Sequence, residues 1–174
     1  MKKILLLSDS HSHIDNKIIK HAKWSDEIWH AGDIGNIEVI DVLKKHSLVR
    51  AVYGNIDDHL IRKIYPENNF FKCENTPVLL THIGGYPGKY SRRTSDLLSK
   101  FKPKIFISGH SHILKIIQDK EYNLLHINPG ACGITGFHQK RTMVRFEIDG
   151  NEIKNLFVID LGNRSTINVD DLLT

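Results

Sequence analysis

The chain has 174 residues, of which 40% are hydrophobic and 25% are charged, and its formal net charge is +4. This composition excludes a disordered chain and offers no long apolar span, and the length suits a single domain over residues 1–174. A net charge of +4 is compatible with an anionic substrate but identifies none.

The first third of the chain predicts strands that alternate with helices. In chain order, the apolar and helically spaced segments are "KKILLLS" (2–8, strand), "DNKIIKHAKW" (15–24, helix), "EIWHAGD" (27–33, strand), "NIEVIDVLKKH" (36–46, helix) and "LVRAVYGN" (48–55, strand). Asp15 and Asn16 are suited to cap the first helix. This β-α-β-α-β order predicts a largely parallel sheet with right-handed crossovers.

The second half is richer in strands, with one amphipathic helix expected at residues 91–101. The predicted strands are "TPVLLTH" (76–82), "PKIFISGH" (103–110), "ILKIIQD" (113–119), "NLLHINPG" (123–130), "TMVRFEI" (142–148) and "IKNLFVID" (153–160). The short turns "DKEYN" and "DGN" indicate hairpins, so antiparallel pairing is expected late in the chain. The whole pattern predicts an α/β fold of two stacked mixed β-sheets flanked by helices.

Polar residues follow an apolar run at several points in the chain. In α/β sheets the loops beyond the carboxyl ends of the strands form the ligand-binding crevice, so these residues are expected to converge. Asp9 and His11, two residues apart in an extended segment, could grip one ion, and His110 and His112 repeat the spacing. Each fragment alone is weak evidence for a ligand site. A single Gly-Asp or Gly-Asn is usually a turn, and His82 taken by itself is more often a structural histidine.

As an ordered set these fragments resemble the signature blocks of the calcineurin-like metallophosphoesterases. The blocks are "DSH" (9–11), "GD" (32–33), "GN" (54–55), "TH" (81–82) and "GHSH" (109–112). The short chain and the "GNID" form of the third block look most similar to the small bacterial and archaeal phosphodiesterases of this family. The resemblance implies a metallophosphatase-like αββα sandwich and a binuclear metal centre, in which a metal-bridging hydroxide hydrolyses a phosphodiester.

The resemblance also implies a set of metal ligands, some of them catalytic. One ion would be held by Asp9, His11, Asp33 and His112, and the other by Asp33, Asn55, His82 and His110. Asp33 would bridge the two ions, and Asp33 and Asn55 would act in catalysis. Imidazole and oxygen ligands without thiolate favour manganese, with iron, nickel or zinc as alternatives. Two divalent ions, two carboxylates and a hydroxide would leave roughly one positive charge for a phosphodiester anion.

The chain departs from the family after Gly54-Asn55. Many relatives carry a histidine there that stabilises or protonates the leaving oxygen, and this chain has Ile56. His13 is predicted to be a catalytic residue, either in contact with the metal ligands or on the substrate side, provided that the chain stays extended beyond His11. Asp57 is expected to be either a turn carboxylate or a partner for His82.

The remaining histidines and cysteines are interpreted as structural. His30, His46 and His126 are assigned to the scaffold, and "NPGA" (128–131) resembles the block that closes the family's site. Cys73 and Cys132 lack metal-type spacing and are expected to be buried in a cytoplasmic protein. The N-terminal apolar run is too short for an export signal.

A second function stays open beside the enzyme. A eukaryotic retromer subunit shares the family's fold and acts as a protein-binding scaffold, so the alternative is a non-catalytic scaffold of the same fold. For the enzyme, the expected partner is a small phosphodiester substrate, and a homo-oligomer is compatible with the sequence. Nucleic acid and membranes are not expected as partners, because the chain shows no added nucleic-acid-binding domain and no spanning segment.

Overall fold

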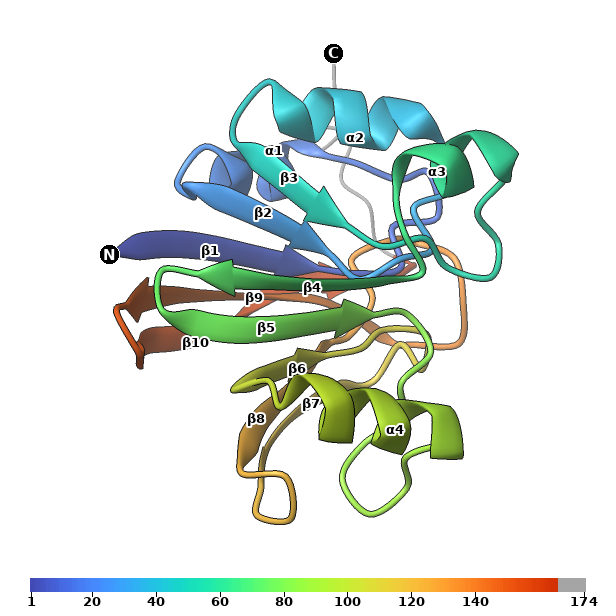
Figure 1. The fold of residues 1–174 in the computed structure, drawn as a ribbon. Coiled ribbons are helices and arrows are strands. Elements are labelled where there is room, and N and C mark those ends of the chain that lie inside the picture. The colour runs from blue at the N-terminus through green and yellow to red at the C-terminus, as the bar shows by residue number, and fades with distance from the viewer. Residues whose placement is uncertain (166–174) are drawn as a thin grey trace.

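Two five-stranded β-sheets pack face to face and helices cover their outer sides in the computed structural model, which describes residues 1–165 (Figure 1). The elements are β1 (Lys2–Leu7), α1 (Asn16–Ala22), β2 (Glu27–His30), α2 (Ile37–Lys44), β3 (Leu48–Ala51), α3 (His59–Ile64), β4 (Asn68–Cys73), β5 (Thr76–Thr81), α4 (Arg92–Phe101), β6 (Ile105–Ile107), β7 (Leu114–Asp119), β8 (Leu124–Pro129), β9 (Lys140–Asp149) and β10 (Glu152–Asn163). The predicted two-sheet α/β architecture is confirmed. The single domain predicted over residues 1–174 stays a prediction, and residues 166–174 lie outside the described part.

The first sheet has the strand order β10-β9-β1-β2-β3. Its β1, β2 and β3 are mutually parallel, as the alternation of strands and helices predicts, and β9 and β10 join in antiparallel fashion. The second sheet has the order β4-β5-β6-β8-β7, with β5, β6 and β8 parallel and the two edge strands antiparallel. The late hairpins β7–β8 and β9–β10 are therefore present, although β6 and β8 pair in parallel.

Two elements were not predicted from the sequence. The helix α3 spans six residues and buries only Ile61, so it is too short for a helical period to stand out. The edge strand β4 has mixed polar and aromatic residues and depends on its pairing with β5.

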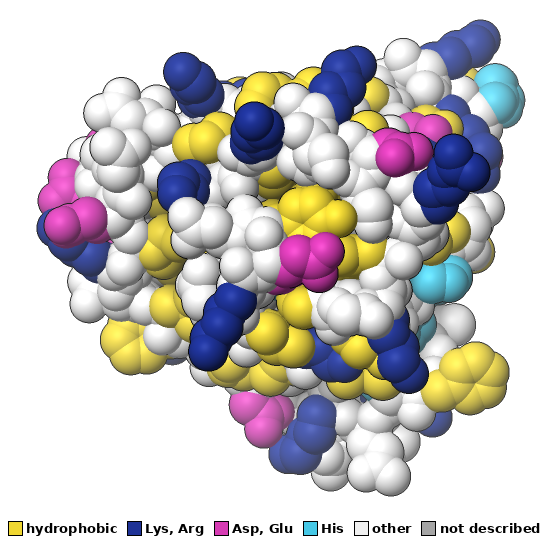
Figure 2. Space-filling view, turned by 60° about the horizontal axis from the view of Figure 1, so that its bottom comes forward, with side chains coloured by type: hydrophobic (Ala, Val, Ile, Leu, Met, Phe, Trp, Pro, Cys, Tyr) yellow, Lys and Arg dark blue, Asp and Glu magenta, His cyan; other side chains and the backbone are white. Residues whose placement is uncertain are grey.

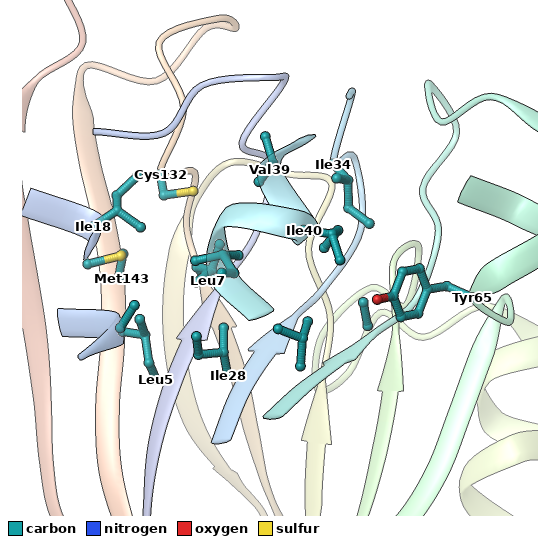
Figure 3. Close-up of a cluster of buried hydrophobic side chains, with 14 of the residues drawn as sticks. Leu5, Leu7, Ile18, Ile28, Ile34, Val39, Ile40, Tyr65, Cys132 and Met143 are labelled. Atoms are coloured by element: carbon teal, nitrogen blue, oxygen red, sulfur yellow. The ribbon is translucent and has the colours of Figure 1, made fainter. Parts of the chain in front are cut away.

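The first strand shows why the core has several layers. Its residues alternate between two faces, so that Ile4 and Leu6 pack between the sheets, whereas Leu5 and Leu7 pack beneath the helices. Burial on both faces explains the unbroken apolar run at this strand. Figure 3 shows the helix-side cluster, in which the labelled side chains are Leu5, Leu7, Ile18, Ile28, Ile34, Val39, Ile40, Tyr65, Cys132 and Met143.

Both cysteines are buried with free thiols, as predicted. Burial raises the pKa of Cys73 to about 11 and that of Cys132 to about 12, so neither is a ready thiolate ligand. Within residues 1–165, no helix is both long enough and apolar enough to cross a membrane.

Candidate metal centre

The side chains predicted to bind metal come together at one edge of the two sheets. They follow the carboxyl ends of β1 (Asp9, His11), β2 (Asp33), β3 (Asn55), β5 (His82) and β6 (His110, His112). These strand ends point to the same side of the molecule in Figure 1, on the right of that view. In Figure 2 the visible histidines also lie on the right-hand side.

Asp9, His11 and His112 form a first group, whose candidate ligand atoms all lie within 4.8 Å of one another. Nε2 of His112 lies 3.2 Å from Oδ1 of Asp9 and 3.3 Å from Nε2 of His11. Among residues 1–165, Oδ1 of Asp9 is fully buried and accepts no hydrogen bond. Because an unsatisfied buried carboxylate oxygen is costly, this atom fits the role of a cation ligand.

Asp33, His82 and His110 form a second group within the same distance limit, and Asn55 adjoins it. Nε2 of His82 lies 3.2 Å from Oδ1 of Asp33 and 3.1 Å from Oδ1 of Asn55. Nδ1 of His82 donates to the carbonyl of Ala31 at 2.8 Å. This bond orients the ring and directs Nε2 at two oxygen atoms, an arrangement that a cation among them would satisfy.

Asp33 connects the two groups. Its Oδ1 faces His82, while its Oδ2 lies 3.7 Å from Nε2 of His11. The amide of Ile56 donates to Oδ1 at 3.1 Å and so helps to orient the carboxylate. One side chain therefore presents an oxygen to each group.

The pKa values of Asp33 and His82 shift in opposite directions, because each side chain stabilises the charged form of the other. Burial by itself would raise the pKa of Asp33, but the hydrogen bond and charge of His82 and the amide of Ile56 lower it. Burial would lower the pKa of His82, but Asp33 and Asp9 raise it. The carboxylates thus favour positive charge at this point, as they would favour a metal cation.

Neither spaced pair, Asp9 with His11 or His110 with His112, lies in extended backbone, which corrects the geometry on which their expected pairing was based. The φ angles are 53° at Asp9, 46° at His11, 52° at Asp33, 68° at His110 and 58° at His112. This left-handed conformation is uncommon for residues other than glycine and is typical of functional sites. Asp9 and His11 nevertheless share the first group, whereas His110 and His112 belong to different groups, as the family resemblance implies.

Two glycines of the motifs allow the groups to approach each other. A Cβ atom at Gly54 would collide with Oδ1 and the backbone nitrogen of Asp33. A Cβ atom at Gly32, where φ is +90°, would lie 2.7 Å from Nδ1 of His82. The "GD" and "GN" blocks therefore need glycine for close packing against candidate ligands.

His13 lies outside both groups. The chain turns at His11 and Ser12, both with positive φ, so the extended path on which its predicted orientation depended does not occur. Nε2 of His13 instead lies 3.1 Å from Oδ2 of Asp15, which also pairs with the buried Arg141 at 2.6 Å. Its predicted catalytic role has no support in this geometry.

Asp57 is a turn carboxylate. Its oxygens accept hydrogen bonds from the amides of Gly35 and Gly54, both at 2.7 Å, and so tie the second and third motif loops together. Asn128 of the "NPGA" block has a similar function, because its amide donates to the carbonyl of Gly109 at 2.8 Å. Both residues hold the loops that carry the candidate ligands.

His30 and His126 are buried and hydrogen-bonded, in agreement with their structural assignment. His30 pairs with Oγ of Ser10 at 2.9 Å, and His126 pairs with Oγ of Ser108 at 3.1 Å. Burial lowers the pKa of each to about 4, so both rings are neutral near pH 7.

His138 was missed by the sequence analysis. Its Nε2 lies 3.0 Å from the carbonyl of Gly133, and its Nδ1 lies 3.1 Å from Nδ1 of His112. Since a carbonyl only accepts, Nε2 of His138 is the donor, and Nδ1 of the neutral ring then accepts from His112. This chain of hydrogen bonds leaves Nε2 of His112 unprotonated, with its lone pair directed into the first group. Sequence spacing gave no signal for this contact.

Two hollows in the surface adjoin the candidate ligands. One of about 190 Å³ is lined by Asn55 and His82 and extends toward Arg62 and Arg93. The other, of about 220 Å³, includes His110 among its lining residues and extends toward Tyr86, Ile113 and Lys115. Ile83 lines both.

The chain was compared with known families and proteins. The model of the calcineurin-like phosphoesterase superfamily domain matches residues 1–151. A curated relative, described as a probable metallophosphoesterase of Methanothermobacter thermautotrophicus, is 27% identical over 153 residues, which cover 85% of this chain and 87% of the relative.

Solved structures with a similar fold come from both bacteria and eukaryotes. A protein of Streptococcus pneumoniae described as a predicted phosphoesterase superposes with a TM-score of 0.68 and 22% identity, covering 99% of this chain and 92% of the other. Wild-type Vps29 of Entamoeba histolytica in complex with Zn²⁺ superposes with a TM-score of 0.69 and 17% identity, covering 91% and 98%. At these identities the likeness shows the fold alone.

Proposed function

The chain belongs to the calcineurin-like phosphoesterase superfamily, and from that premise we propose that it is a phosphodiesterase with a binuclear metal centre. The observation that carries the proposal is the position of Asp33 between the two groups of candidate ligands. A carboxylate with one oxygen toward each group is suited to bridge two ions, as in two-metal hydrolytic sites.

Each ion would have its own set of side chains in addition to Asp33. The first would be held by Asp9, His11 and His112, and the second by Asn55, His82 and His110. The buried and unsatisfied Oδ1 of Asp9 supports the first site, and the two oxygens around Nε2 of His82 support the second. Nitrogen and oxygen donors without thiolate favour manganese, with iron, nickel or zinc as alternatives.

The chemistry divides between the ions and the protein. When bound, two divalent ions would supply Lewis acidity and a water acidified for attack on phosphorus. The chain's own residues orient the ligands: Ala31 holds the ring of His82, His138 holds that of His112, and the amide of Ile56 holds Asp33. The aliphatic side chain of Ile56 offers no proton to a leaving oxygen, so cleavage should favour leaving groups that are already acidic.

The two hollows favour a diester over a monoester. A phosphodiester carries an organic group on each of two ester oxygens. One hollow is lined by His82 and the other by His110, and both histidines belong to the same group. Each hollow can therefore take one arm of a small substrate. On the face shown in Figure 2, lysines and arginines are spread among hydrophobic and acidic side chains, which fits a small substrate better than a long polyanion.

The location proposed for this activity is the cytoplasm. The two buried cysteines with free thiols are compatible with that reducing compartment.

The experiment that tests the enzyme starts from protein stripped of metal. Addition of Mn²⁺ should restore hydrolysis of bis(p-nitrophenyl) phosphate, and p-nitrophenyl phosphate should be cleaved more slowly. Asp33→Asn, prepared in the same way, controls for metal-catalysed background. If none of the four metals, manganese, iron, nickel and zinc, restores hydrolysis, the enzymatic proposal is refuted.

A non-catalytic scaffold is the second candidate function. One observation favours it. Three isoleucines that each directly follow a candidate ligand, Ile56, Ile83 and Ile113, are 46%, 53% and 60% exposed. Phe137, which directly precedes His138, is also exposed. Exposed apolar side chains beside a site are typical of protein-binding surfaces as well as of substrate pockets. The reconstitution experiment separates the two functions, because a scaffold, in which bound metals are vestigial or absent, would gain no hydrolysis.

A further inference from the structure

The hollow beside Asn55 and His82 contains charge that the proposed metal centre does not use. Arg62 and Arg93 line it together with Glu67. The arginines come from separate elements, Arg62 from α3 and Arg93 from the first turn of α4. Two guanidinium groups and one carboxylate leave a net positive charge next to the candidate ligands.

Arg62 is held in place by neutral groups. Its Nε donates to the carbonyl of Asp57 at 2.7 Å, and its Nη2 donates to the carbonyls of Asn55 at 3.1 Å and Gly54 at 3.3 Å. The guanidinium also lies over the ring of Tyr53, 4.8 Å from its centroid. Within residues 1–165 it forms no ion pair with a carboxylate, so a preorganised cation is left with Nη1 available to a ligand.

Arg93 forms one solvent-exposed ion pair, which another anion can displace. Its Nη2 lies 2.7 Å from Oε1 of Glu67, and the two side chains are 51% and 49% exposed. Pairs this exposed contribute little to stability, so an incoming anion can replace the carboxylate. The charge also does not stabilise α4, because the amino end of a helix favours anions over cations.

We propose that this hollow binds a second phosphate group of the substrate, so that the natural substrate is a phosphodiester with a further phosphate on one arm. The inference rests on the proposed function, because a metal centre that includes Asn55 and His82, which line the hollow, would hold the scissile phosphate beside it. Guanidinium groups match the oxygens of phosphate by paired hydrogen bonds, which favours arginine over lysine at such a site.

The test measures binding to the manganese-loaded full-length protein by calorimetry, with two pairs of probes. Orthophosphate is compared with pyrophosphate, and thymidine 5′-phosphate with thymidine 3′,5′-bisphosphate, all with free Mn²⁺ held constant. In at least one pair the doubly phosphorylated probe should bind about tenfold tighter or more. Absence of this preference in both pairs would overturn the inference.

Three variants assign the preference to the hollow. Arg93→Ala should remove most of it, whereas Arg92→Ala, an exposed neighbour on the same helix outside the hollow, should leave it intact. Glu67→Gln should strengthen binding of the doubly phosphorylated probe, because it removes the carboxylate that competes for Arg93. Equal effects of Arg92→Ala and Arg93→Ala, or weaker binding in Glu67→Gln, would overturn the inference.

Hydrolysis of bis(p-nitrophenyl) phosphate by the same preparations distinguishes the two proposals. Hydrolysis without the binding preference refutes only the second phosphate site. The binding preference without hydrolysis keeps the anion site, and it refutes the phosphodiesterase when iron, nickel and zinc also fail to restore hydrolysis.

Discussion

Asp33 divides its carboxylate between two histidines from different loops: Oδ1 lies 3.2 Å from Nε2 of His82, and Oδ2 lies 3.7 Å from Nε2 of His11. The two histidines belong to separate groups of candidate ligands. Within residues 1–165, Asp33 is the only one of the seven candidate ligands whose side chain forms ion pairs with histidines of both groups.

Asp33→Ala should therefore empty both metal sites, whereas His82→Ala should chiefly empty one. Metal analysis of the purified variants after equilibration with Mn²⁺ gives the number of ions per chain. Two tightly bound ions in Asp33→Ala would contradict the bridging role, and complete loss in His82→Ala would contradict the division into two sites.

His138→Ala should weaken metal binding without removing any proposed ligand. The change deletes the acceptor for Nδ1 of His112, and loss of such an orienting partner typically costs about 10- to 100-fold in metal affinity. His138→Gln should retain more affinity, because its amide can both accept from His112 and donate to the carbonyl of Gly133. Competition with a fluorescent chelator measures the affinities, and equal affinities in all three proteins would exclude a positioning role.

Ile56→His should rescue substrates with poor leaving groups. A positioned general acid is typically worth about 10² to 10⁴ in rate for such substrates and little for a nitrophenolate. The unaltered protein should cleave aryl diesters far faster than alkyl diesters, and the variant should narrow this difference, provided that the new ring leaves Asn55 in place. Rates for a series of diesters with leaving groups of graded acidity provide the measurement.

His13→Ala completes the test of the leaving-group acid. Since His13 pairs with Asp15 outside both groups, the variant should keep the steep dependence on leaving-group acidity. Selective slowing of alkyl diesters would restore His13 as the catalytic acid predicted from the sequence.

Asp15→Asn should destabilise the fold strongly at neutral pH. Asparagine can still cap α1, but it leaves the buried guanidinium of Arg141 without its charged partner, which typically costs about 3–5 kcal/mol. Lys140→Gln, which breaks the exposed pair with Asp160, is the matched control and should cost less than about 1 kcal/mol. Urea unfolding of the three proteins gives the free energies.

The stability difference between Asp15→Asn and the unaltered protein should also depend on pH. Burial works to raise the pKa of Asp15, but hydrogen bonds from His13, Ile18 and Arg141 outweigh it and hold the pKa well below its usual range. A carboxylate with a lowered folded-state pKa contributes its full stability above the unfolded value of about 3.9 and loses it as the pH falls toward the folded value. The difference should thus be constant near pH 7 and shrink below about pH 4; a difference that stays constant into acid would contradict this linkage.

The sequence by itself determined the order of the strands and helices other than α3 and β4, and it also identified the candidate ligands. The apolar run before Asp9 marks β1 because residues buried on both faces leave no polar positions, and this signal is local. The helix expected at 91–101 matches α4, whose amphipathic pattern is equally local. Polar residues that follow strands at their carboxyl ends were expected to converge there, and the resemblance to the calcineurin-like family implied which of them are ligands.

The family resemblance implied that His110 and His112 serve different ions, but only the tertiary structure decided the backbone path that places them there. His110 and His112 are two residues apart, yet their left-handed backbone sends them to different groups, and no pattern of residue types specifies those φ angles. His138 reaches His112 across 26 residues of chain, and His13 turns toward Asp15 because the loop folds back. Periodicity reports which face of an element is buried, whereas the direction of a side chain in a loop depends on contacts with segments distant in sequence, which is why these positions required the folded chain.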